Sequence, residues 1–194
     1  SEITTKVTTP AEPIDSDNPN QQVPTLDPST GLVTVRPGTP AGDYTITYEI
    51  CETLNPSNCD EAVVTITVEA AEIKAIDDSF GPLTSKAGGN TVSVLDNDTL
   101  NRKQVVLAEV NLTPGASPNA GLTMNSDGSI KVAPGTPAGS YEYPYEICEK
   151  LNPANCAQGK ATVEVVQLDA VDDTPPSLNG KDGGTTEQPV TEND

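Results

Sequence analysis

The sequence predicts an all-β protein made of tandem antiparallel β-sandwich domains. Three observations lead to this prediction: apolar and polar residues alternate along short stretches, Pro and Gly cluster between those stretches, and a long block of sequence occurs twice. Aromatic residues make up only 3% of the chain, so its core must consist mainly of Val, Ile, Leu and Ala with a few Tyr. Such a core suits thin sandwiches of modest stability.

Residues 44–51 and 63–68 alternate as a half-buried strand requires. The apolar positions that share one face are Tyr44, Ile46, Tyr48 and Ile50 in the first stretch, and Val64, Ile66 and Val68 in the second. We expect these two faces to form core, with the intervening side chains on the outer side.

The segment Pro-Gly-Thr-Pro-Ala-Gly occurs before Tyr44 and again before Tyr141. Its prolines and glycines predict a tight corner that leads into a strand. The tyrosine that follows has two interpretations. It is either a tyrosine corner, whose hydroxyl reaches nearby backbone, or an ordinary core residue after a turn.

The repeated block recurs at an offset of 97 residues. Residues 31–70 and 128–167 share 21 identities in 40 positions aligned without gaps. Two acidic motifs recur at similar offsets, namely 75–78 with 170–173 and 95–98 with 191–194. A period near 97 residues corresponds to one immunoglobulin-like sandwich and is far too long for a solenoid repeat.

The register of the motifs divides the chain into three parts. Residues 1–70 are predicted to be the C-terminal part of one immunoglobulin-like repeat, 71–168 a complete repeat, and 169–194 the N-terminal part of a following repeat. This register fits a piece of a long array, which we favour, or head-to-tail subunits that complete one another by strand donation.

The four cysteines form two pairs with the same spacing, Cys51 with Cys59 and Cys148 with Cys156. By alternation, Cys51 and Cys59 both fall on the outer side of adjacent strands, so each pair is expected to bridge the mouth of a hairpin. Closing such a loop stabilises a domain by roughly 2–3 kcal/mol. The pairing also predicts an oxidising, extracytoplasmic environment. The alternatives are free thiols or a metal site, but no further soft ligand accompanies either pair.

Charge and composition exclude several functions. The formal net charge of −19 repels phosphate backbones and anionic membranes, so we expect no nucleic-acid partner. The chain has no run of 18 apolar residues, which argues against direct membrane insertion. It also has no His, the commonest general base and metal ligand, so we expect a protein that is not an enzyme.

Clustered carboxylates and amides suggest a calcium site, because calcium prefers oxygen ligands in loops. The candidate ligands are Asp77, Asp78, Asp96, Asn97 and Asp98. The alternative interpretation is that these are acidic turn residues on an already acidic surface.

Three motifs together resemble a known class of protein: Ala-x-Asp-Asp at 75–78, Gly-Gly-x-Thr-x-Ser-Val-Leu-Asp-Asn-Asp-Thr-Leu at 88–100, and Tyr-Glu-Ile-Cys-Glu-x-Leu-Asn-Pro-x-Asn-Cys from Tyr48 and from Tyr145. They are similar to the tandem immunoglobulin-like or cadherin-like repeats of giant Bacteroidota cell-surface adhesins, of the SprB-like gliding-motility type. The resemblance implies an extracellular location on a bacterial cell surface, and calcium at the acidic residues. Asp98-Thr99-Leu100 also resembles the O-glycan acceptor motif of Bacteroidota, which makes Thr99 a candidate for glycosylation.

The leading prediction for function is a structural repeat of an adhesin filament that mediates surface attachment and gliding motility. Its expected partners are neighbouring repeats and a surface or polysaccharide ligand. One alternative is a pilus-like fibre subunit that polymerises by strand exchange. Another is a glycan-binding module, but sugar sites usually present aromatic platforms, and the chain has no Trp and only five Tyr.

Overall fold

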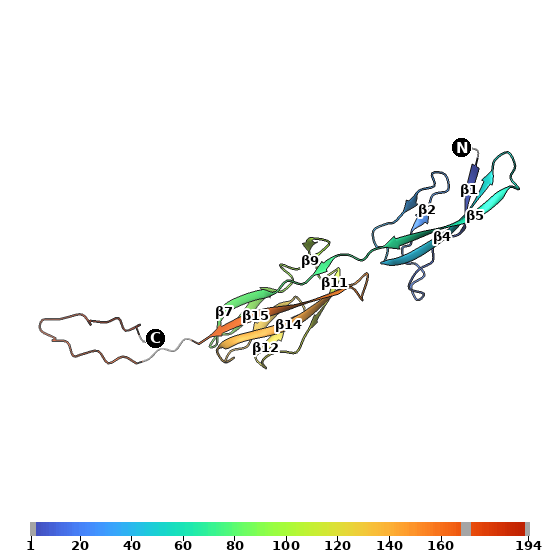
Figure 1. The fold of residues 1–194 in the computed structure, drawn as a ribbon. Coiled ribbons are helices and arrows are strands. Elements are labelled where there is room, and N and C mark those ends of the chain that lie inside the picture. The colour runs from blue at the N-terminus through green and yellow to red at the C-terminus, as the bar shows by residue number, and fades with distance from the viewer. Residues whose placement is uncertain (1–2, 168–171, 193–194) are drawn as a thin grey trace. The chain divides into compact units, whose positions relative to one another are not determined.

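The computed structural model describes residues 3–167 and 172–192, and this part of the chain consists of strands joined by turns and loops (Figure 1). The fold is all-β and immunoglobulin-like, as the sequence predicts. No helix within the described ranges is long and apolar enough to cross a bilayer. Parts of the recurring motifs, at Ala170, Val171, Asn193 and Asp194, lie outside the described residues.

The chain divides into two compact units that interleave in sequence. The first unit comprises residues 1–74, 99–111 and 147–157, and the second comprises residues 75–98, 112–146 and 158–194. Three strands, β11 (Val110–Pro114), β14 (Gly139–Glu149) and β15 (Cys156–Val166), contribute residues to both units.

The main sheet of the first unit has the order β1-β4-β5. Its strands are β1 (Ile3–Thr9), β4 (Gly42–Glu52) and β5 (Cys59–Val68). Strands β4 and β5 form a long antiparallel hairpin, in which Gly42 pairs with Val68 at one end and Cys51 pairs with Cys59 at the other (Figure 1). Strand β5 is the outer strand of this sheet in the part of the chain that the structure describes.

Short strands complete the first unit. They are β2 (Thr25–Leu26) with β3 (Val33–Thr34), and the three-stranded sheet of β10 (Lys103–Gln104), β9 (Thr99–Leu100) and β6 (Ile73–Lys74). Tyr44, Ile46 and Ala11 form a buried cluster against which Val64, Ile66 and Val68 of β5 pack while only partly buried. The predicted alternation is therefore confirmed for Tyr44 and Ile46, and β5 covers them only partly. It is not seen at Tyr48 and Ile50, because residues 47–51 are all half-buried.

The larger sandwich packs a four-stranded sheet against a three-stranded one. The first sheet has the order β11-β14-β15-β7, with β7 at Asp78–Thr84. The second has the order β12-β13-β8, with β12 at Leu122–Met124, β13 at Ser129–Val132 and β8 at Gly89–Ser93. Strand β7 runs parallel to β15, from the Asp78 and Ala161 pair to the Thr84 and Val166 pair, which the expectation of antiparallel sheets did not include.

The core between these sheets is built from aliphatic residues and tyrosines, as the composition requires. Val94, Ile130, Ile147, Ala161 and Val163 are completely inaccessible to solvent. They come from both sheets, so the alternating side chains of the two inner faces fill a single core.

Both proline-glycine corners have the geometry of a tyrosine corner. The Tyr44 hydroxyl donates to the Pro40 carbonyl at 2.9 Å, and the Tyr141 hydroxyl donates to the Pro137 carbonyl at 2.8 Å. Within the same corners, Gly38 and Gly135 adopt φ values of 87° and 83°, which side-chain-bearing residues rarely adopt. Of the two interpretations left open by the sequence, the tyrosine corner is the one that the structure adopts.

Candidate functional site

The candidate site forms in the second unit, where the turn after β8 meets the segment before β7. The Leu95 N–H donates to the Ser93 hydroxyl, and the Asp96 N–H donates to the Ser93 carbonyl, so the chain turns sharply after β8. Val94 and Leu95 enter the core at this turn. The turn then directs Asp98 inward, where its side chain is 0% exposed.

The two acidic motifs form one polar clamp. The Asp98 carboxylate accepts the Ile76 N–H at 2.7 Å through its Oδ1 atom. The Asn97 amide donates to the carbonyls of Ile76 at 3.2 Å and Asp77 at 3.5 Å. The motif at 95–98 thus holds the backbone of the motif at 75–78, which explains why the two motifs occur together in the sequence.

The hydroxyl of Tyr145, on β14, lies at the centre of this clamp. Four oxygen acceptors surround its oxygen: Asp98 Oδ1 at 3.1 Å, the Ile76 carbonyl at 3.2 Å, Asp78 Oδ2 at 3.3 Å and the Val94 carbonyl at 3.4 Å. A phenol has a single proton to donate. The cluster therefore holds more acceptors than donors and favours the binding of a positive charge.

Within this cluster, Asp98 is the residue that a bound positive charge would stabilise most. Its Oδ2 atom is buried and has no hydrogen-bond partner among the described residues. A carboxylate removed from water with one oxygen unpartnered is costly unless it binds a proton or a cation. Burial accordingly raises the pKa of Asp98, although the Ile76 N–H and the Tyr145 hydroxyl oppose this effect.

The same buried environment also raises the pKa values of Asp78 and Tyr145. Burial raises the pKa of Asp78 to about 6, and the negative charge of Asp98 adds to the effect, against hydrogen bonds from Tyr145 and Asn97. Burial, followed by the charges of Asp98 and Asp78, also raises the pKa of the Tyr145 hydroxyl, so it remains protonated. At neutral pH the Tyr145 hydroxyl is therefore a neutral donor between the two acidic side chains.

The structure brings some of the predicted ligands together and leaves others at the margin. Asp78, Asn97 and Asp98 belong to the cluster, whereas the side chain of Asp77 is exposed and accepts the Lys160 N–H at 3.1 Å. The Asp96 side chain is exposed and makes no hydrogen bond to the cluster within the described part of the chain. Thr99 lies half-buried in β9. Because Asp98 is completely buried, the interpretation of the whole motif as surface turn residues is wrong for that residue.

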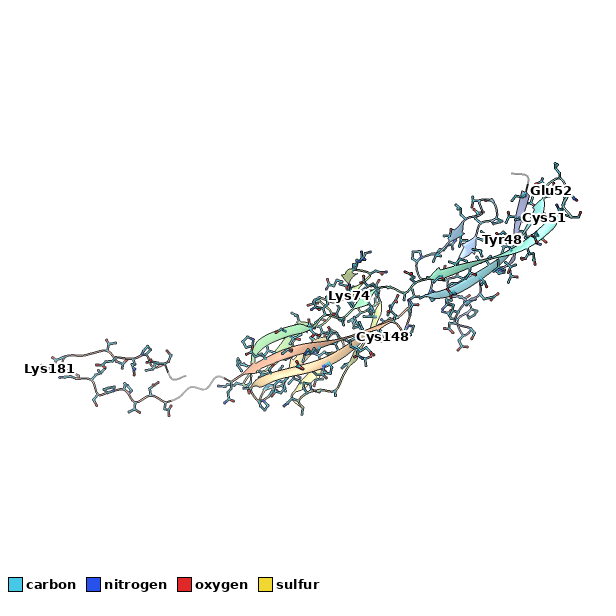
Figure 2. All side chains as sticks on the ribbon, in the orientation of Figure 1. Tyr48, Cys51, Glu52, Lys74, Cys148 and Lys181 are labelled. Carbon is cyan, nitrogen blue, oxygen red and sulfur yellow. A yellow bond between two sulfur atoms is a disulfide. The ribbon has the colours of Figure 1, made fainter. Side chains whose placement is uncertain are left out.

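Both cysteine pairs are disulfides at the end of a hairpin. Cys51–Cys59 and Cys148–Cys156 each span 8 residues, and each has a Cα–Cα distance of 4.1 Å. Figure 2 shows Cys51 beside Glu52 near the turn that joins β4 to β5. Glu49 lies close to the first pair and Glu146 close to the second, which resembles a metal-binding group. A sulfur in a disulfide carries no thiolate charge, so these groups lack the soft ligands that a metal site requires.

The glutamate that follows each first cysteine organises the disulfide loop. Glu149 is buried, and its Oε2 atom accepts the side-chain amides of Asn152 and Asn155, both at 2.9 Å. In the other copy, the Asn58 amide donates to Glu52 Oε2 at 3.3 Å. These contacts give a structural reason for the recurrence of Glu and Asn in the Cys-Glu-x-Leu-Asn-Pro-x-Asn-Cys motif.

The sequence reasoning missed the role of Tyr145 in the acidic cluster. The sequence marks Tyr145 only as the first residue of the repeated cysteine motif, whereas the structure buries it, as it does Tyr143 and Ile147. A buried phenol needs a partner for its hydroxyl, and that requirement could have linked it to a nearby acidic motif. The sequence alone did not indicate which motif lies beside it.

Comparisons with known proteins add the following. No family model matches the chain, and no curated protein matches it in sequence. Among solved structures, the EC22-24 segment of mouse cadherin-23 is similar, with a TM-score of 0.39 and 12% identity over 86% of this chain and 53% of that one. The human desmocollin-1 ectodomain gives a TM-score of 0.34 and 10% identity over 92% of this chain and 35% of that one. The chain thus spans about half or less of these structures.

Proposed function

We propose that this chain is a segment of an extracellular array of sandwich repeats that acts as a structural module of an adhesive filament on a bacterial cell surface. The observation that carries this proposal is the occurrence, twice in one chain, of the same disulfide-closed hairpin with the same spacing and the same Cα–Cα distance. An array that transmits force benefits from such repeated closures. Surface attachment and gliding motility are the roles that we propose for the filament.

The chemistry of the chain supports an extracellular role. All four cysteines are in disulfides, which persist in oxidising compartments. The net charge of −19 keeps a repetitive protein soluble and limits its contact with anionic surfaces. We propose neighbouring repeats as the main partners, and a surface or polysaccharide as the ligand of the complete filament.

The repeat register proposed for the array places its boundaries at the acidic motifs. In this register residues 1–70 end one repeat, 71–168 form a complete one, and 169–194 begin another. Thr99 remains a proposed glycan acceptor. Because it is only half-buried and lies in a two-residue strand, mass spectrometry of the natively secreted chain provides a direct test.

We further propose that the acidic cluster binds calcium. The candidate ligands are Asp77, Asp78, Asp96, Asn97 and Asp98, together with backbone carbonyls of the clamp. The unpartnered Oδ2 atom of buried Asp98 and the excess of oxygen acceptors around Tyr145 support this proposal. Calcium would supply the positive charge that the cluster lacks, and it would link the turn after β8 to the segment before β7.

Thermal unfolding of the whole chain tests the calcium proposal. Calcium should raise the midpoint of the transition that involves the second unit, and a chelator should reverse the rise, because a ligand that binds only the folded state stabilises it. The substitution Asp98→Asn should remove the response. Unchanged midpoints with and without calcium would contradict the proposal.

Stretching single molecules between the two ends tests the structural role. In the oxidised chain each disulfide hides the 8 residues that it spans from extension, so reduction should lengthen the unfolded chain by about 25 Å per disulfide. A structural module should also refold after repeated extension. Failure of either sandwich to resist force before unfolding would argue against a load-bearing role.

A further inference from the structure

Gly159 lies against the ring of Tyr145 inside the second unit. Gly159 belongs to β15, and Tyr145 belongs to the neighbouring strand β14. A Cβ atom added at position 159 would lie 2.7 Å from both the Cζ atom and the hydroxyl oxygen of Tyr145, and 3.0 Å from its Cε1 atom. Carbon atoms in contact are ordinarily about 3.5–4.0 Å apart. The tyrosine ring therefore occupies the space that a side chain at position 159 would fill.

The backbone conformation at Gly159 does not itself require glycine. Its φ angle lies outside the left-handed region, in which glycine is favoured over other residues. Glycine inside a strand weakens that strand, and it often marks a place where another group approaches closely. The approach of the Tyr145 ring is therefore the physical reason for glycine at this position.

The other copy of the hairpin carries a different residue at this position. At the offset of 97 residues, Tyr145 corresponds to Tyr48 and Gly159 corresponds to Ala62. Tyr48 and Ala62 lie directly opposite each other in the pairing of β4 with β5. A ring placed against alanine as Tyr145 is placed against glycine would overlap the Cβ atom. The residue at this position thus determines where the ring of the opposite tyrosine can lie.

The position of the Tyr145 hydroxyl determines how the acidic cluster presents its carboxylates. The hydroxyl oxygen lies 3.1 Å from Oδ1 of Asp98 and 3.3 Å from Oδ2 of Asp78. Oδ1 of Asp98 also accepts the Ile76 N–H, so both of these contacts use the same oxygen of the Asp98 carboxylate. Its Oδ2 atom has no hydrogen-bond partner among the described residues. Hydrogen bonds that orient a carboxylate in this way strengthen its binding of a metal ion.

We propose that Gly159 is a positioning residue of the calcium site, because it lets the Tyr145 ring lie against β15 and directs the hydroxyl to Asp78 and Asp98. This inference rests on the calcium binding proposed above. Gly159 acts through Tyr145, whose hydroxyl holds Oδ1 of Asp98 and leaves Oδ2 for the cation. The calcium affinity of the second unit therefore depends on the absence of a side chain at position 159.

Terbium luminescence of the whole chain tests the proposal. Terbium(III) binds the oxygen ligands that calcium prefers, and a nearby excited tyrosine transfers energy to it. The chain has no Trp, so tyrosine is the energy donor. We expect terbium emission that calcium displaces, and we expect Tyr145→Phe to remove most of the emission that is excited through tyrosine. Emission excited directly in the metal reports binding in every variant.

Gly159→Ala should weaken terbium binding roughly 10- to 100-fold, the usual effect of disturbing a group that orients a metal ligand. The matched control is Gly121→Ala, in the same unit, whose Cβ would overlap the Thr136 hydroxyl and does not meet Tyr145. This control should leave the terbium affinity unchanged. Equal weakening by the two substitutions would overturn the proposal, because crowding anywhere in the sandwich would then suffice.

The unsubstituted chain separates the two proposals. Absence of terbium binding that calcium displaces would overturn the calcium site and, with it, the role of Gly159. Binding that Gly159→Ala does not weaken would overturn the role of Gly159 alone.

Removing the tyrosine ring provides a second test, which needs no metal. Tyr145→Leu lacks the Cε1, Cζ and hydroxyl atoms that an added Cβ at position 159 would meet. Gly159→Ala should therefore lower the midpoint of thermal unfolding in the unsubstituted chain and lower it much less in the Tyr145→Leu chain. If Gly159→Ala alone does not fold, the double variant should fold. Equal lowering in the two chains, or a double variant that does not fold although Tyr145→Leu does, would overturn the proposal.

Discussion

The hydroxyl of Tyr145 lies 3.1 Å from Oδ1 of Asp98, whereas Oδ2 of the same carboxylate has no hydrogen-bond partner among the described residues. One oxygen of a completely buried group is thus well satisfied and the other is not. The cluster is poised to take up a positive charge, and a proton and a metal ion are alternative sources of it. This relationship determines the first three predictions.

The stability of the second unit should fall as the pH rises from about 4.5 to about 6.5. The folded state holds the pKa of Asp78 at about 6, above its ordinary value of 3.8, so it binds more protons than the unfolded state in this window. Loss of those protons destabilises the fold, and the dependence ends above the folded pKa. Urea denaturation at several pH values, in the presence of a chelator, measures the slope.

The main groups with the opposite pH dependence titrate below this range of pH. Hydrogen bonds from Ser29 and Ser129 lower the pKa values of exposed Asp27 and Asp127, respectively. Any stability that these two residues contribute is lost only at lower pH, below their ordinary values. Stability that increases with pH inside the window would contradict the assignment to Asp78 and Asp98.

Two substitutions of Asp98 should distinguish the contribution of its charge to stability from that of its hydrogen bonds. Asp98→Ala leaves the Ile76 N–H and the Tyr145 hydroxyl without their acceptor, which we expect to cost about 1–3 kcal/mol of unfolding free energy. Asp98→Asn keeps an acceptor oxygen and removes the charge, so it should cost less and flatten the pH dependence. Chemical denaturation in the presence of a chelator, which removes any contribution of calcium, compares both variants with Asp96→Asn, an exposed control expected to change stability by no more than about 0.5 kcal/mol.

Tyr145→Phe should loosen the clamp, because it removes the donor shared by Asp78 and Asp98. We expect a loss of about 1 kcal/mol and faster hydrogen exchange at the Ile76 amide, which Asp98 holds in place. The corresponding Tyr48→Phe serves as the control, since the Tyr48 hydroxyl has no partner in the described structure. Equal effects of the two substitutions would argue against a special role for the cluster.

Removing one disulfide should destabilise its hairpin without abolishing the fold. The double substitution Cys148→Ser and Cys156→Ser opens a loop that spans 8 residues, and the chain-entropy model gives a loss of about 2–3 kcal/mol. The amides of Asn152 and Asn155 still bind Glu149, so the loop should keep part of its structure. Thermal unfolding measures the shift, and an unchanged midpoint would show that the loop is already closed by those contacts.

Much of the fold could be predicted because alternation and repetition are local signals. The inward faces of β4 and β5 follow from Tyr44, Ile46 and Val64, and the pairing of Cys51 with Cys59 follows from spacing and parity. The parallel pairing of β7 with β15 could not be predicted, because it joins segments about 80 residues apart and no local pattern specifies strand direction.

The candidate site was only half predictable for the same reason. The motifs at 75–78 and 95–98 indicate oxygen ligands, but they do not indicate which side chains turn inward. The turn after β8 buries Asp98 and leaves Asp96 exposed, although both are aspartates two residues apart. The contribution of Tyr145 depends on a contact across the sandwich, which the chain order alone does not reveal.

The parallel pair of β7 and β15 also determines how this sandwich bears load. Strands β7 and β15 are the first and last strands of this sandwich, and they run in the same direction. Tension applied to the N-terminal end of β7 and the C-terminal end of β15 therefore slides the two strands along each other. The hydrogen bonds between the two strands are then strained together in shear, and they cannot be peeled apart one at a time. We expect this sandwich to resist rupture more strongly along this direction than along one that peels the two strands apart.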